Sequence, residues 1–139
     1  MTEIPGKPSV LFVCSRNGGK SQIAAGLMRE LAGDAVEVRS GGTNPGNCLN
    51  EESVESLAEL GIDISGEQPR GVTDEDLAAA DVVVVLGTEA KLEPKGPARF
   101  ETWVTDEPSA RGIEGMERMR LLRDDIRGRV QKLLDGLER

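Results

Sequence analysis

The chain has 139 residues, 25 of them acidic and 17 basic, and its formal charge is −8. Nucleic acid and anionic membrane surfaces are therefore unlikely partners, and one hydrophobic core can form without disulfides. Because histidine is absent, histidine-dependent nucleophilic catalysis and the common zinc sites are excluded, and we expect no metal site. The sequence has no apolar run of membrane-spanning length and no signal-peptide core, so we expect a cytoplasmic protein with reduced cysteines. We expect a flexible leader at residues 1–8 and one domain at residues 9–139.

The stretch from residue 9 to residue 21 reads SVLFVCSRNGGKS and organises the rest of the chain. Ser9–Val13 is short, apolar and rich in β-branched residues, which predicts a buried strand. Apolar residues at helical spacing predict a helix over Gln22–Ala32. A strand, a glycine-containing loop and a helix N-terminus together form an anion cradle, because loop amides and the helix dipole favour negative charge. Cys14 lies at the floor of this cradle.

The remaining segments alternate between helix and strand patterns. They predict strands at Val36–Ser40, Asp81–Leu86 and Arg99–Trp103. They also predict helices at Glu51–Leu60 and Ile113–Leu137, and a short helix that begins at Thr73. Asn50 is expected to cap the first of these helices, and Asp76 is the expected capping-box partner of Thr73. This alternation predicts an α/β fold, a doubly wound four-stranded parallel sheet with helices on both faces. Ligands of such sheets bind beyond the carboxyl ends of the strands.

Cys14 is placed to act as a thiolate nucleophile on a tetrahedral oxyanion, although a cysteine that only packs is the simpler alternative. Lys20 lies six residues later and can return over the same anion as a compact charge. Asn17 and Ser21 are interpreted as residues that brace the loop or stabilise the thiolate. The role of Arg16 stays open between ligand contact and a solvated side chain. The oxyanion-binding set comprises Ser15, Arg16, Asn17, Gly18, Gly19, Lys20 and Ser21.

Asp106 and Glu107 follow a late strand at the same edge of the sheet, so either is a candidate general acid. Cys48 is a candidate resolving thiol, and a bystander role is the simpler interpretation. The segment CSRNGGKS also matches the nucleotide-binding loop G-x-x-x-x-G-K-[ST], except that Cys14 replaces the first glycine. The carboxyl end of the strand that ends at Leu86 lacks an acidic residue, because Gly87 and Thr88 follow it, which disfavours a nucleotide hydrolase.

The residues VLFVCSRNGGKS resemble the V-L-F-V-C-x-G-N-x-C-R-S signature of the low-molecular-weight tyrosine phosphatase superfamily, which includes arsenate reductases of the same fold. Four later segments match that family in order: Arg39–Thr43, Gly61–Ser65, Asp81–Leu86 and Asp106–Pro108. The resemblance implies that Cys14 is the nucleophile and that Lys20 stands in for the family's arginine. It also implies an acid immediately before the proline, where this chain has Glu107, with Asp106 one residue earlier.

Thioredoxin-coupled arsenate reductases of this fold carry resolving cysteines just after the strand that corresponds to Asp81–Leu86. This chain has Gly87 at that position. The nucleophile loop most resembles that of the actinobacterial arsenate–mycothiol transferases. That resemblance implies an arsenate reductase of the thiol-transferase type, with no bound cofactor, mycothiol as co-substrate and a mycoredoxin or glutaredoxin-like partner. A low-molecular-weight phosphomonoesterase or protein tyrosine phosphatase, and a non-catalytic oxyanion-binding module, stay open as alternatives.

Overall fold

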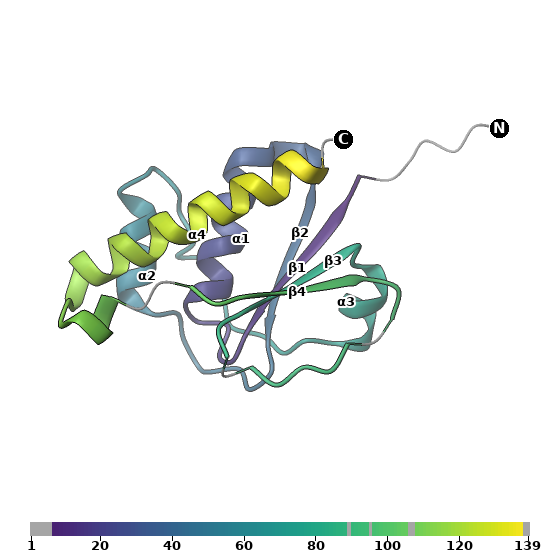
Figure 1. Ribbon diagram of the computed structural model, residues 1–139, viewed down its shortest axis with the longest axis horizontal. Coiled ribbons are helices and arrows are strands. Elements are labelled where there is room, and N and C mark those ends of the chain that lie inside the picture. The colour runs from purple at the N-terminus through teal and green to yellow at the C-terminus, as the bar shows by residue number, and fades with distance from the viewer. Residues whose placement is uncertain (1–6, 89, 95, 106–107, 138–139) are drawn as a thin grey trace.

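The computed structural model describes residues 7–88, 90–94, 96–105 and 108–137. At its centre is a four-stranded sheet in the order β2-β1-β3-β4 (Figure 1), in which every pair of neighbouring strands is parallel. The strands are β1 Ser9–Cys14, β2 Glu37–Gly42, β3 Val82–Leu86 and β4 Arg99–Trp103. The predicted doubly wound α/β fold is confirmed.

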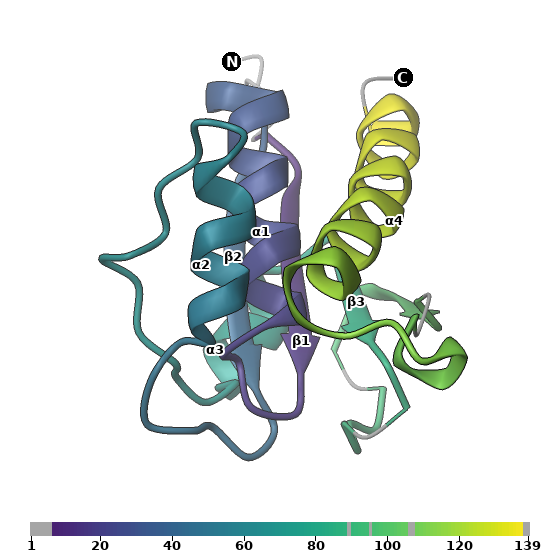
Figure 2. The same cartoon turned by 90° about the vertical axis from the view of Figure 1, so that its left-hand side faces the viewer.

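Helices cover both faces of this sheet. They are α1 Lys20–Ala32, α2 Glu51–Ala58, α3 Asp74–Ala79 and α4 Gly115–Leu137, and 3-10 turns occupy Gly33–Ala35 (η1) and Pro108–Arg111 (η2). On one face α1 packs against both α2 and α4, and these three helices lie together in Figure 2, whereas α3 contacts β1 from the other face. None of the helices in the described ranges is long and apolar enough to cross a membrane.

The central strand β1 divides the core into two halves because successive side chains of a strand point to opposite faces. Val10 and Phe12 belong to the cluster that includes α1 and α4, while Leu11 and Val13 pack with Leu77 of α3. All four of these β1 side chains have no exposed surface. Each such burial stabilises the fold by roughly 1.5–3 kcal/mol, so β1 is held rigidly between its neighbours.

Several element boundaries differ from those expected. The first helix begins at Lys20 rather than at residue 22, so its N-terminus lies inside the glycine loop. The last helix begins at Gly115 rather than at residue 113, behind a 3-10 turn that the sequence did not predict. The second helix ends at Ala58 rather than at residue 60, just before Gly61 takes the left-handed conformation (φ 79°).

The second strand was expected to end at Ser40 but continues to Gly42, where it pairs with Cys14. This extension brings β2 close against the nucleophile loop. A Cβ on Gly42 would lie 2.7 Å from the carbonyl oxygen of Ser15, a separation that only glycine permits. The glycines at 41 and 42 therefore allow the strand to reach the loop.

Candidate active site

Cys14 is the last residue of β1, and its sulfur lies within the loop that follows. The Sγ atom is 3.2 Å from the backbone nitrogen of Asn17, which donates to it, and 2.9 Å from the hydroxyl oxygen of Ser21. The residue is 7% exposed, and its sulfur contacts two polar groups rather than hydrocarbon alone. A thiolate here would therefore be stabilised by donors that are already in place.

Asn17 gives the loop its shape and also fixes the direction of the Ser21 hydroxyl. Its backbone is left-handed (φ 56°), a conformation that asparagine tolerates better than most residues. Its Oδ1 accepts from the backbone N–H of Arg70 at 3.0 Å, so its Nδ2 is the atom that donates to Ser21 Oγ at 2.7 Å. Because that hydroxyl oxygen accepts from Asn17, its own proton is available to Cys14 Sγ.

Two residues that the sequence analysis missed brace Asn17. Gln22 is 1% exposed, and its Nε2 donates to both the backbone oxygen and Oδ1 of Asn17, each at 3.1 Å. A glutamine in the otherwise apolar start of the first helix was a signal that could have identified it. The contribution of Arg70 comes from its backbone N–H, which no side-chain pattern reveals.

The segment that carries Arg70 is itself anchored. Its guanidinium donates to both carboxylate oxygens of Asp76, at 2.6 and 2.8 Å. Burial raises the pKa of Asp76, but hydrogen bonds from Thr73 together with the charges of Arg70 and Arg39 outweigh that effect and hold the pKa below its ordinary value. The backbone oxygen of Arg70 also accepts from Gly42 N at 2.8 Å. A buried carboxylate on α3 thus helps to fix the position of the nucleophile loop.

The N-terminus of α1 faces the same loop. Its cap is Gly19, which offers no side chain, and its first turn contains no acidic residue. The first-turn N–H groups and the helix dipole therefore favour an anion from outside the helix. A pocket of about 150 Å³ at this position is lined by Cys14, Ser15, Arg16, Lys20, Leu86 and Gly87.

Lys20 and Arg16 are the two cationic residues that line this pocket. A Cβ on Gly87 would lie 3.5 Å from the Lys20 ammonium, which places that ammonium beside the carboxyl end of β3. Gly87 has φ 88°, a conformation that favours glycine, and it occupies the position just after β3. The lysine and the cysteine thus meet across the ends of two neighbouring strands.

The other predicted site residues are distributed around this pocket. Arg16 is exposed and lines both the small pocket and an adjoining pocket of about 520 Å³. Cys48 is an exposed free thiol that lines only the adjoining pocket. Asp106 and Glu107 lie outside the described residues, so the candidate general acid stays a prediction.

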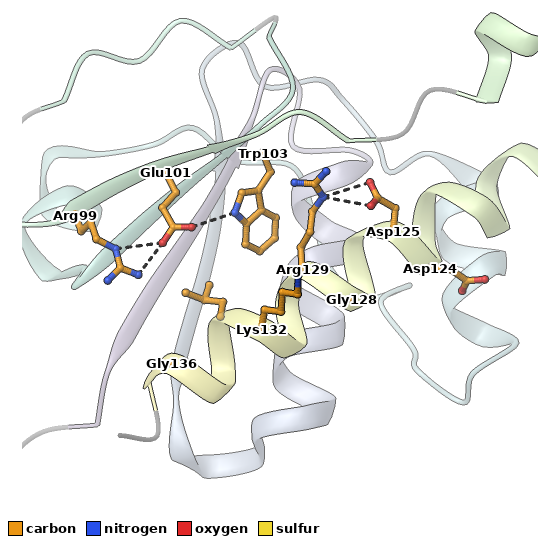
Figure 3. Close-up of a pocket in the computed structure, with 10 residues that line it drawn as sticks. Arg99, Glu101, Trp103, Asp124, Asp125, Gly128, Arg129, Lys132 and Gly136 are labelled. Carbon is orange, nitrogen blue, oxygen red and sulfur yellow. Dashed lines mark hydrogen bonds and ion pairs between the residues drawn. The ribbon is translucent and has the colours of Figure 1, made fainter.

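A larger pocket of about 650 Å³ lies between β4 and α4 (Figure 3). Four of its charged side chains form two ion pairs, Arg129–Asp125 at 3.3 Å and Arg99–Glu101 at 2.7 Å. Its aromatic residue, Trp103, donates from Nε1 to Glu101 at 3.2 Å (Figure 3). No cysteine lines it, so the cradle at Cys14 is the stronger candidate for covalent chemistry.

The chain is similar to several proteins that are named arsenate reductases. The chain is 35% identical over 130 residues to a putative arsenate reductase of Halobacterium salinarum, covering 89% of each chain. It is 30% identical over 128 residues to the glutaredoxin arsenate reductase of Synechocystis, covering 90% of this chain and 95% of that one.

Among solved structures, the thioredoxin-dependent arsenate reductase Cg_ArsC1' of Corynebacterium glutamicum superposes with a TM-score of 0.82 at 30% identity. The match covers 98% of this chain but 64% of that protein, so the chain spans less than two thirds of its length. These relatives confirm the prediction that the chain belongs with the arsenate reductases of this superfamily. The family model for the low molecular weight phosphotyrosine protein phosphatases matches residues 9–139, and the chain belongs to that family.

Proposed function

We propose that this protein is an arsenate reductase of the thiol-transferase type. The observation that carries the proposal is the position of Cys14 Sγ, which accepts from the Asn17 N–H and faces the Ser21 hydroxyl in a pocket that also holds Lys20. Relatives named arsenate reductases, at 30–35% identity over most of the chain, support arsenate as the substrate.

In the first step, arsenate lies on the loop amides and the α1 N-terminus, with Lys20 balancing its charge. The Cys14 thiolate attacks arsenic and forms an S–As bond, and one arsenate oxygen leaves as water after protonation. We assign that protonation to Glu107 or Asp106. Arsenic remains As(V) in this step, because one oxygen ligand has been exchanged for sulfur.

In the second step, a low-molecular-weight thiol takes the arsenic from Cys14. A new S–As bond forms, the Cys14–As bond breaks, and the proton of the incoming thiol passes to Cys14. A separate redoxin then attacks the sulfur of the thiol–arsenate adduct. The two thiols are oxidised to a mixed disulfide, and arsenic leaves as arsenite, As(III).

We propose mycothiol as this thiol. The chain has two cysteines, and Gly87 occupies the position after β3 where a resolving cysteine would lie. An internal disulfide relay is therefore disfavoured, and an external thiol must accept the arsenic. The names of the two relatives that include glutaredoxin and thioredoxin support a redoxin as the final reductant.

Purified protein incubated with arsenate, mycothiol and a mycoredoxin tests the proposal. We expect arsenite to form with multiple turnovers and to require all three components. Cys14→Ser should form none, while its melting temperature stays close to that of the wild type. A wild-type protein that binds arsenate but makes no arsenite would contradict the proposal.

The family description favours a second candidate, a phosphomonoesterase that uses the same cysteine. In that case aryl phosphate would be hydrolysed through a Cys14–phosphate intermediate, and thiol would not affect turnover. Hydrolysis that Cys14→Ser abolishes, without any arsenite formation, would establish this alternative.

A further inference from the structure

We propose that the pocket of about 520 Å³ beside the cradle binds the low-molecular-weight thiol that takes arsenic from Cys14. The inference rests on the proposed function and adds a second binding site to it. The ligand class is a polar thiol that carries several amide or hydroxyl groups. We call this cavity, between the loop at 46–50 and the start of α4, the thiol pocket.

The two cavities differ in size as their two ligands would. The pocket at Cys14 holds about 150 Å³, enough for a tetrahedral oxyanion and little else. The thiol pocket, at about 520 Å³, falls in the roughly 300–1,000 Å³ range of small-molecule sites. A co-substrate several times larger than arsenate therefore fits beside it and not within it.

The lining of the thiol pocket combines hydrogen-bonding groups with an apolar floor. Amide side chains come from Asn47 and Asn50, and apolar surface comes from Leu49, Met119 and Leu122. Asn50 uses only its Oδ1 to cap α2, where it accepts from Ser53 N at 2.8 Å, so the cap does not consume its amide N–H groups. Such a surface suits a ligand with hydroxyl and amide groups on a carbon frame.

Charge in this pocket favours the same assignment. Arg16, Lys20 and Arg118 line it, and none of its described lining residues is acidic, although the whole chain carries a charge of −8. Positive groups near the entering sulfur favour its thiolate form, which is the attacking species. The positive lining therefore serves the incoming thiol as well as the arsenate.

The thiol pocket is also connected rigidly to the nucleophile loop. Gly46 N donates to Arg16 O at 3.0 Å, and Asn50 N donates to Gly18 O at 2.7 Å. Arg16 and Lys20 line both cavities, so they form the boundary between them. A thiol bound on one side of this boundary has its sulfur close to arsenic bound on the other.

Filling the thiol pocket with an indole ring tests the inference. Cys48 is exposed and lines the pocket, so Cys48→Trp should occupy the cavity with little effect on folding. We expect the KM for mycothiol to rise about 10-fold or more, since an indole buries a large area that the ligand would otherwise cover. The KM for arsenate and the single-turnover arsenylation of Cys14 should change less than twofold.

Asn47→Trp provides a second variant from the same wall, in case the first perturbs the loop. The matched control is Ala79→Trp on the exposed surface of α3, against the opposite face of the sheet. The control should keep both KM values. Normal arsenite formation by the wild type, together with an unchanged mycothiol KM in both pocket variants, would overturn the thiol pocket and leave the proposed function intact. Absence of arsenite from the wild type would overturn both.

Discussion

The N-termini of α1 and α3 show how differently one chain can treat the same structural feature. At α3, Thr73 accepts from Asp76 N, Asp76 accepts from Thr73 N, and the first turn carries Asp74, Glu75 and Asp76. At α1, the cap is Gly19, which has no side chain, and the first turn has no acid. The α3 terminus is capped by its own side chains, whereas the α1 terminus has no side-chain cap.

The two N-termini differ in what their residues contribute: those at α3 stabilise the fold, whereas those at α1 lie beside the nucleophile Cys14 that we propose. A capping box satisfies two backbone donors reciprocally and typically stabilises a protein by about 1 kcal/mol. The α1 terminus lacks that contribution and instead places Lys20 beside Cys14. Four changes to these two termini should therefore have effects of different kinds.

The largest effect is expected from an acid at the open terminus. Lys20→Glu removes one of the two cations that line the pocket and puts a carboxylate where we propose that the oxyanion binds. Arsenate affinity should therefore fall about 100-fold, whereas neutral Lys20→Gln should lose about 10-fold. Isothermal titration of arsenate measures both losses, with Lys20→Arg as the charge-preserving control. Equal affinities for the Glu and Gln variants would show that the α1 terminus does not contact the anion.

A smaller loss is expected from Ser21→Ala. The hydroxyl lies 2.9 Å from Cys14 Sγ, and its oxygen already accepts from Asn17, so its proton can be donated to the sulfur when the sulfur acts as nucleophile. Losing one hydrogen bond to a charged sulfur should slow the alkylation of Cys14 by iodoacetamide at pH 7 about 10-fold or more. Measuring the rate in a Cys48→Ser background removes the signal of the second thiol. An unchanged rate would show that the Ser21 hydroxyl does not affect the reactivity of Cys14.

At the closed terminus, Asp76→Asn should affect stability and its pH dependence. The pKa of Asp76 lies below its ordinary value of 3.8, because the donors from Thr73 and the charge of Arg70 outweigh burial. The stabilisation is therefore complete above pH 3.8 and is lost as the pH falls through the lower, folded-state pKa. Urea unfolding between pH 2 and pH 7 should show a shallower acid loss for Asp76→Asn than for the wild type. The same steepness in both proteins would assign the acid sensitivity to other carboxylates.

The smallest effect is expected from Thr73→Ala. This change removes the hydroxyl that accepts from Asp76 N at 3.1 Å and should lower the free energy of unfolding by about 1 kcal/mol. The rate of Cys14 alkylation should stay the same, because α3 lies on the opposite face of the sheet from α1. A slower rate would instead show that the anchoring of Arg70 by Asp76 reaches the thiol through Asn17.

Local sequence patterns predicted much of the fold. The apolar runs of β1 and β3 predicted buried parallel strands, and Asn50 and Thr73 each began a helix as their cap chemistry predicts. The alternation of strand and helix predicted the four-stranded parallel sheet. Helices and strands could be predicted in this way because periodicity and capping depend on residues within a few positions of one another.

The cradle at Cys14 was predicted for the same reason, since strand, loop and helix start are consecutive in the chain. The contacts that support it were not predicted. Asn17 is held by the backbone of Arg70, which lies 53 residues away, and the thiol pocket is closed by the start of α4. Strand β2 ran two residues past its expected end because its glycines could approach the loop.

The sequence by itself determined which elements form, their order, and the cysteine, lysine and glycines of the nucleophile loop. Only the tertiary structure decided that the α1 terminus has no side-chain cap beside Lys20, that the Ser21 hydroxyl lies 2.9 Å from the sulfur, and that a second cavity adjoins the first. The physical reason is that helix and strand formation depends on neighbouring residues, whereas the direction of a hydrogen bond and the shape of a cavity depend on segments that packing brings together.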